Sequence, residues 1–153
     1  MPTMRFNHME LTLAPGELDE TRRAEISRFY DEVLGWKSSS VRILGQDALL
    51  LQVDETVSQF ILVAESPKPM HSPGYDHLGL LMESRAEVDQ VLERCRSFQS
   101  QDDRVAIKEY PDLDQGVVCV HAFYLKYLLP IWFDVQSMEW QAGAEPTKRW
   151  SFG

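Results

Sequence analysis

Features that define several common protein classes are missing from this chain of 153 residues. No apolar run approaches the roughly 18 residues that suggest a membrane-spanning helix. The N-terminus, Met-Pro-Thr-Met-Arg-Phe-Asn-His, lacks the apolar segment of a signal peptide. We therefore expect a cytoplasmic protein that has no membrane partner.

Clusters of basic residues and paired cysteines are also missing. The formal net charge is −9 and no group of Lys and Arg stands out, which argues against binding to nucleic acid. The two cysteines, Cys95 and Cys119, form no CxxC motif. In the expected cytoplasmic setting both are reduced thiols, and neither supports a zinc-ribbon or redox function.

The sequence does contain a pattern of elements that occurs twice. Each half begins with an alternating strand, continues with an amphipathic helix and ends with further strands. The first half predicts strands at about 5–13, 36–43, 48–53 and 57–64 around a helix near 19–34. The second predicts strands at about 75–82, 105–110, 116–125 and 130–136, with a helix that begins at the capping-box sequence Ser84–Glu87.

This order predicts an α+β fold of two tandem βαβββ modules that form a curved mixed sheet around a central cavity. We expect the first module over residues 1–66 and the second over 75–137. Residues 67–74 form a Pro-rich linker. The polar tail, 138–153, is expected to be irregular, and the whole chain to be one structural domain.

One histidine lies at a matching place in each module. His8 and His77 both stand in the first strand of their half. The alternate positions of those strands are apolar and would pack on the helix of the same module: Met9, Leu11 and Leu13 in one, Leu78, Leu80 and Met82 in the other. Strand alternation therefore predicts that both imidazoles point to the opposite face, into the cavity.

The last strand adds a carboxylate to these two imidazoles. Ile131, Phe133 and Val135 form its apolar face, so Asp134 shares the cavity face with Trp132 and Gln136. A carboxylate there is costly to bury unless it is paired or bound to a cation. His8, His77 and Asp134 together match a three-ligand divalent metal site, with Fe or Mn favoured and Zn, Ni or Co also compatible. The alternative is that the histidines are ordinary hydrogen-bonded residues.

Four segments of the chain resemble the vicinal oxygen chelate superfamily, which includes glyoxalase I, extradiol dioxygenases and fosfomycin- and bleomycin-resistance proteins. The most specific is RFYDEVLGW at Arg28–Trp36, which looks like the family's signature at the end of the first helix. The others are Phe6–Leu11, Tyr75–Leu80 and Ile131–Val135. The resemblance covers about residues 4 to 137.

The resemblance implies metal ligands at the positions of His8, His77 and Asp134. It also implies acid/base groups beside the metal, for which Tyr124 and His121 are the candidates, although a regular strand cannot place both on one face. Glu10, Gln59 and Trp132 are expected to line the substrate cavity.

The chain departs from the family pattern at three places. Asp134 stands where the family usually has Glu, and Lys126–Pro130 replaces its usual turn before that strand. The last strand of the first module, Ser58–Val63, offers no carboxylate or histidine as a fourth ligand. This lack disfavours glyoxalase I chemistry unless Gln59 or Glu10 substitutes.

Three functions remain open from the sequence. The leading hypothesis is a metal-dependent enzyme similar to extradiol dioxygenases, acting on a small cyclic or aromatic substrate. The second is a glyoxalase-like lyase or isomerase that uses the same metal. The third is a metal-free protein that binds a small molecule, as in the bleomycin-resistance branch. The resemblance also implies a homodimer, with modules paired within or between chains.

Overall fold

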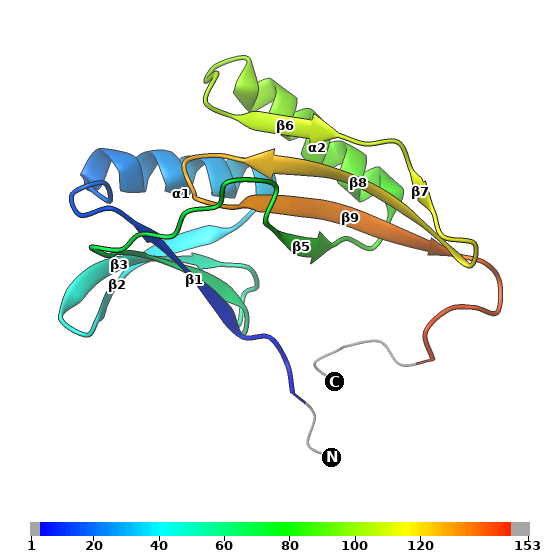
Figure 1. Ribbon diagram of the computed structural model, residues 1–153, viewed down its shortest axis with the longest axis horizontal. Helices are drawn as coiled ribbons and strands as arrows, with labels where there is room; N and C mark the ends of the chain where they lie inside the picture. The colour runs from blue at the N-terminus through cyan, green and yellow to red at the C-terminus, as the bar shows by residue number, and fades with distance from the viewer. Residues whose placement is uncertain (1–3, 148–153) are drawn as a thin grey trace.

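The computed structural model describes residues 4–147 and has the α+β fold of two βαβββ modules (Figure 1). The first module consists of β1 (His8–Leu13), α1 (Glu20–Leu34), β2 (Lys37–Ile43), β3 (Gln46–Gln52) and β4 (Phe60–Glu65). The second consists of β5 (His77–Leu81), α2 (Arg85–Gln99), β6 (Ala106–Glu109), β7 (Leu113–Asp114), β8 (Val118–Lys126) and β9 (Trp132–Trp140). The predicted fold class is confirmed.

The two modules have the same sheet topology. The first sheet has the order β1-β4-β3-β2 and the second the order β5-β9-β8-β6, with β7 added beside β8. In each sheet the first strand runs parallel to the last strand of its module. His8 lies opposite Phe60 in one pair and His77 lies opposite Trp132 in the other. The two histidines therefore occupy equivalent positions in the register.

Local signals in the sequence set the ends of both helices. Asp19 caps the start of α1 by accepting a hydrogen bond from the backbone of Arg22, and Gly35 ends that helix in the left-handed conformation, with φ of 75°. At the start of α2, Ser84 and Glu87 form both hydrogen bonds of the predicted capping box.

One hydrophobic core joins the modules. The ring of Phe29 on α1 stacks on Tyr127, at a centroid distance of 4.4 Å, and meets Phe98 of α2 edge-on at 5.0 Å. The hydroxyl of the buried Tyr30 donates to the backbone oxygen of Tyr127 at 3.1 Å. Apolar residues from both helices and both sheets continue this cluster. The helix-bearing faces of the two sheets therefore turn toward a shared interior.

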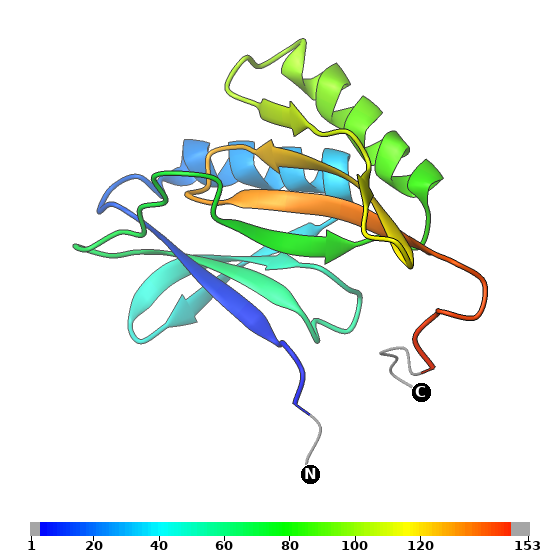
Figure 2. The same ribbon diagram turned by 45° about the vertical axis from the view of Figure 1, so that its right-hand side comes forward.

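The opposite face of each sheet, which we call its outer face, turns away from that core. His8 lies on the outer face of the first sheet and His77 on that of the second, and both are exposed. Strands β1 and β5 make no contact with each other and run in different directions (Figure 2). Within this chain the two histidine faces are therefore separate and do not line one common cavity.

The second module differs in two places from its sequence-based prediction. Strand β9 continues to Trp140, four residues beyond the predicted end near Gln136, because Ser137 to Trp140 pair with His121 to Val118 of β8. The two-residue strand β7 on the other side of β8 was not predicted. No helix within residues 4–147 has the length and apolar character needed to cross a membrane.

Because Phe29 connects the modules, replacing it should destabilise the whole fold. We expect Phe29→Ala to lower the free energy of unfolding by about 3–5 kcal/mol in one cooperative transition. Urea denaturation followed by circular dichroism measures this. Phe6→Ala, at a side chain that is 94% exposed, is the control and should change stability by less than about 0.5 kcal/mol. Two separate transitions in the Phe29 variant would show that the modules fold independently.

Candidate functional site

Three of the residues singled out from the sequence come together on the outer face of the second sheet. Strand β5 supplies His77, β8 supplies Tyr124 and β9 supplies Asp134. The Tyr124 hydroxyl lies 3.4 Å from Nε2 of His77, and Oδ2 of Asp134 lies 3.9 Å from the same nitrogen. An imidazole, a phenol and a carboxylate thus converge on one point from three adjacent strands.

The backbone fixes the orientation of His77. Its Nδ1 lies 2.8 Å from the carbonyl oxygen of Tyr75. A carbonyl oxygen can only accept a hydrogen bond, so Nδ1 carries the hydrogen and Nε2 is left with its lone pair. Nε2 is the nitrogen that faces Tyr124 and Asp134. A histidine that binds a metal through one nitrogen commonly donates from the other to a backbone oxygen in this way.

The carboxylate of Asp134 is the unusual member of this group. Asp134 is only 8% exposed, and its Oδ1 atom is buried without a hydrogen-bond partner among residues 4–147. Burial raises the pKa of Asp134, and the nearby His77 opposes the shift. An unsatisfied buried oxygen costs free energy, and a bound cation or ligand donor would recover it.

Tyr124 is held between two other rings. Its ring lies 4.7 Å from His77 and 5.0 Å from Tyr110, measured between centroids. Burial and the neighbouring Asp134 raise the pKa of Tyr124. Its phenol is therefore protonated at neutral pH and can donate a hydrogen bond or a proton at this point.

The spacing of His77 and Asp134 fits two ligands of one divalent metal ion. With metal–ligand bonds of about 2.1 Å, two ligand atoms of one ion lie about 3–4 Å apart. The distance between His77 Nε2 and Asp134 Oδ2, 3.9 Å, falls in this range. Within the described part of the chain, no three His, Cys, Asp or Glu side chains form a group that could hold a metal. One chain therefore offers two of the three predicted ligands together.

The third predicted ligand, His8, lies apart from this pair on the first sheet. Its ring stacks on Phe60 at 4.8 Å, and its Nδ1 lies 2.8 Å from Oδ1 of Asn7. The amide of Asn7 is oriented by its own bond from Nδ2 to the Ser58 carbonyl oxygen. His8 Nδ1 therefore carries the hydrogen, and His8, like His77, has its lone pair on Nε2.

The register shows where the symmetry of the two modules ends. Glu10 lies opposite Leu62 in the first sheet, and Gly79 lies opposite Asp134 in the second. Leu62 thus occupies the position in the first module that corresponds to Asp134. An isobutyl side chain there cannot supply a ligand, so the first sheet carries the histidine without the carboxylate.

The three predicted cavity residues lie in different surroundings. Trp132, next to His77 in the register, packs its ring on Tyr75 at 5.3 Å. Glu10 is exposed on the outer face of the first sheet. Gln59 precedes β4, and its backbone oxygen accepts a hydrogen bond from Val53. Of the three, only Trp132 adjoins His77 and Asp134.

His121 lies on the opposite face of β8 from Tyr124 and does not contact this site. Its Nε2 lies 2.8 Å from Asp89 on α2, and its Nδ1 lies 2.7 Å from Asp112. Arg85 joins the network through Asp112 at 2.7 Å and Glu139 at 2.8 Å. Of the two predicted acid/base groups, Tyr124 alone lies beside His77 and Asp134. His121 instead connects α2 to the second sheet through its contact with Asp89.

Three further side chains on the outer face were not predicted from the sequence. Lys108 on β6 lies opposite Tyr124, and its ammonium nitrogen lies 3.6 Å from the ring centroid of Tyr75 and 5.1 Å from that of Tyr110. Alternation along β6 could have placed Lys108 on this face. Nothing in the local sequence indicates that Tyr75, from the opposite edge of the sheet, reaches it.

The comparisons with known proteins bear on the fold. No family model and no curated protein matches the sequence. Solved structures do match. A glyoxylase/bleomycin resistance protein/dioxygenase domain from Frankia sp. EAN1pec is 21% identical, with a TM-score of 0.59 over 93% of this chain and 96% of that one. A glyoxalase/bleomycin resistance protein/dioxygenase from Nocardioides is 15% identical, with a TM-score of 0.57 over 97% and 91%.

The fosfomycin resistance protein FosX from Listeria monocytogenes is a third such structure. It is 14% identical, with a TM-score of 0.56 over 89% of this chain and 94% of that one. This chain has the vicinal oxygen chelate fold. Identities this low establish the architecture, so the chemistry has to be argued from the residues themselves.

The network around His121 predicts a pH-dependent contribution to stability. Burial disfavours the imidazolium, but hydrogen bonds to Asp112 and Asp89 outweigh it and raise the pKa of His121. Arg85 and His121 lower the pKa of Asp112 to about 2. Because the pKa of His121 is higher in the folded state, its contribution is complete below the unfolded value of about 6.5 and is lost as the pH rises through the folded value.

We therefore expect His121→Gln to reduce the free energy of unfolding more at pH 5.5 than at pH 9. Urea denaturation at a series of pH values measures the difference between wild type and variant. His71→Gln, at an exposed position of the linker, should show a difference that does not vary with pH. A His121→Gln effect that grows toward pH 9 would contradict the assigned network.

Proposed function

We propose that this protein is a divalent-metal-dependent enzyme that acts on a small molecule, with His77 and Asp134 holding the metal. The observation that carries this proposal is the buried Oδ1 of Asp134, which has no hydrogen-bond partner within residues 4–147. The other oxygen of this carboxylate, Oδ2, lies 3.9 Å from His77 Nε2, the ring nitrogen that carries the lone pair. A cation between them would satisfy both groups.

Homodimer formation would supply the third ligand. His8 has the same tautomer as His77 and lies on an outer face of its own. β1 and β5 do not touch within one chain. If the outer face of the second sheet of one copy packs against that of the first sheet of another, His8 of this other copy completes the site formed by His77 and Asp134. A two-fold symmetric pair would contain two such sites.

The bound metal would act as a Lewis acid that draws two vicinal oxygens of the substrate together and stabilises negative charge on them. Tyr124 would donate its phenolic proton to the substrate or hold an oxygen atom in place, since its hydroxyl lies beside His77 Nε2. Trp132 and Tyr75 would bind the flat part of the substrate by stacking. Because His121 lies on the other face, Tyr124 is the acid/base group of this proposal.

Within this class we favour oxygenation of an aromatic vicinal diol. Leu62 at the position equivalent to Asp134 cannot be a fourth ligand, so the metal keeps three protein ligands in a dimer unless Glu10, on the same face as His8, also binds it. Three ligands leave coordination positions open for a bidentate substrate and O₂. A glyoxalase-like lyase or isomerase would use the same metal without O₂.

Metal binding gives the first test. We expect protein reconstituted anaerobically with Fe(II) or Mn(II) to retain close to one ion per chain, and Asp134→Asn to lower the affinity by at least about 100-fold. Metal analysis and titration calorimetry measure these values. Asp47→Asn removes an exposed carboxylate that pairs with Arg42 and is the matched control. Wild-type occupancy below about 0.1 ion per chain would refute the proposal and favour a metal-free binding protein.

Consumption of O₂ then separates the two enzyme classes. Fe(II)-loaded protein should consume O₂ with catechol, and Tyr124→Phe should slow the reaction by about 10²–10⁴-fold. An oxygen electrode measures the rate. Conversion that proceeds equally well without O₂ would favour the lyase or isomerase.

Mixing two inactive variants tests the shared site. His8→Ala and Asp134→Ala should each lack metal binding and activity. In a mixed dimer one site has both lesions and the other has neither, so random mixing should restore about a quarter of the wild-type sites. Metal retention after unfolding and refolding the two variants together measures the recovery. Retention of metal by His8→Ala alone, or no recovery on mixing, would exclude the arrangement proposed here.

A further inference from the structure

Two lysines flank the candidate site without a carboxylate partner. Strand alternation places three charged side chains on the outer face of the second sheet: Asp134, Lys108 and Lys126. Among the ion pairs formed by residues 4–147, Lys37 is the one lysine that contacts a carboxylate, Asp31, at 2.6 Å. In a chain with a net charge of −9, this face therefore carries more positive than negative charge.

Both ammonium groups rest on aromatic rings. Lys108 lies 3.6 Å from the Tyr75 ring centroid, and Lys126 lies 5.9 Å from that of Trp132. Lys108 is directly opposite Tyr124, and Lys126 is two residues beyond Tyr124 on the same strand. The two lysines are thus diagonal neighbours whose Cα atoms lie about 7–8 Å apart. The spacing is suitable for one small anion to contact both, beside the phenol of Tyr124.

The rings around these cations form a surface for a flat ligand. Tyr75 and Tyr110 are 49% and 38% exposed, and the pairs Tyr75–Trp132 and Tyr110–Tyr124 are each in ring contact. Exposed aromatic side chains gathered at one place on a protein surface are typical of binding sites. A planar ligand could exchange the solvent on these rings for stacking contacts.

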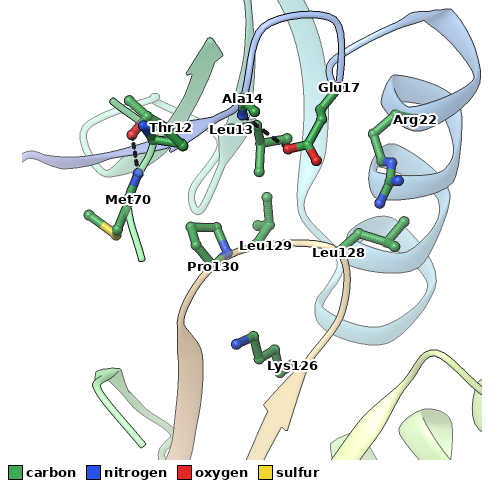
Figure 3. A pocket seen from close by; sticks show the side chains of 11 residues that line it. Thr12, Leu13, Ala14, Glu17, Arg22, Met70, Lys126, Leu128, Leu129 and Pro130 are labelled. Atoms are coloured by element: carbon green, nitrogen blue, oxygen red, sulfur yellow. Dashed lines mark hydrogen bonds between the residues drawn. The ribbon is translucent and has the colours of Figure 1, made fainter. Parts of the chain in front are cut away.

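A pocket adjoins Lys126. It has a volume of about 350 Å³, and Lys126 and Arg22 are the basic residues that line it. Figure 3 shows Lys126 and Arg22 at its edge, with Leu128 between them. The volume lies at the lower end of the range for small-molecule sites. A ligand that reaches Lys126 therefore has space beyond it, lined by two basic side chains and by one carboxylate, Glu17, which accepts a hydrogen bond from the Ala14 backbone.

We infer that the ligand of this site is a small aromatic molecule that carries a carboxylate, which binds between Lys108 and Lys126 while the ring stacks on Tyr75 and Trp132. The inference rests on the proposed ligand site around His77 and Asp134, and it specifies the class of its substrate. The lysines select for the acid group, whereas the metal would bind the vicinal oxygens.

Matched pairs of probes test this selection. For metal-free protein we expect benzoate to bind at least about tenfold more tightly than benzyl alcohol, as measured by titration calorimetry. For Mn(II)-loaded protein we expect the same preference for 3,4-dihydroxybenzoate over catechol. Lys108→Gln and Lys126→Gln should each lower the preference about fivefold. Lys37→Gln, which removes the same charge at an exposed ion pair, should leave it unchanged.

The outcomes separate this inference from the proposed function. Preference for benzoate in a protein that retains no Mn(II) would support the inference and refute the metal-dependent function. Mn(II) binding together with equal affinity for benzoate and benzyl alcohol would support the metal-dependent function and refute the inference. Failure of benzoate to bind, or an equal loss of preference in Lys37→Gln, would overturn the inference. Circular dichroism spectra establish that each variant is folded.

Discussion

The packing of Phe29 against Tyr127 determines how the rest of the molecule is arranged. This contact, reinforced by Phe98 and by the hydrogen bond from Tyr30, brings the helix-bearing faces of both sheets into one core. Once those faces are buried together, the alternation of each strand leaves the other face on the outside. The aromatic contact between the modules is thus the reason that His8 and His77 occupy separate surfaces.

Much of the local structure could be predicted from the sequence because it depends on local rules. Strand alternation correctly assigned Phe133 and Val135 to the core and Asp134 to the opposite face of β9. Gly35 correctly located the end of α1, and the capping box at Ser84–Glu87 correctly located the start of α2. The extension of β9 and the short β7 were missed because both depend on pairing with β8, and their polar residues give no apolar pattern.

The arrangement of the modules could not be predicted in the same way. Identical strand patterns are compatible with histidine faces that meet within one chain or between two chains. The choice depends on which apolar surfaces pack together, and this is a property of distant residues such as Phe29 and Tyr127. The environment of Asp134 was easier to predict, since a carboxylate between buried apolar neighbours is costly unless a cation or a hydrogen-bond donor lies beside it.

Tyr75 contacts both His77, a proposed metal ligand, and the side chains of the proposed ligand-binding surface. Its carbonyl oxygen orients the His77 ring, and its side chain lies on Lys108 and Trp132. A ligand that displaces the Tyr75 ring from Lys108 acts on the same residue that directs His77 Nε2. If such a ligand changes the affinity for the metal by some factor, thermodynamic linkage requires the metal to change the affinity for the ligand by the same factor. The two binding events would then be coupled through a single tyrosine.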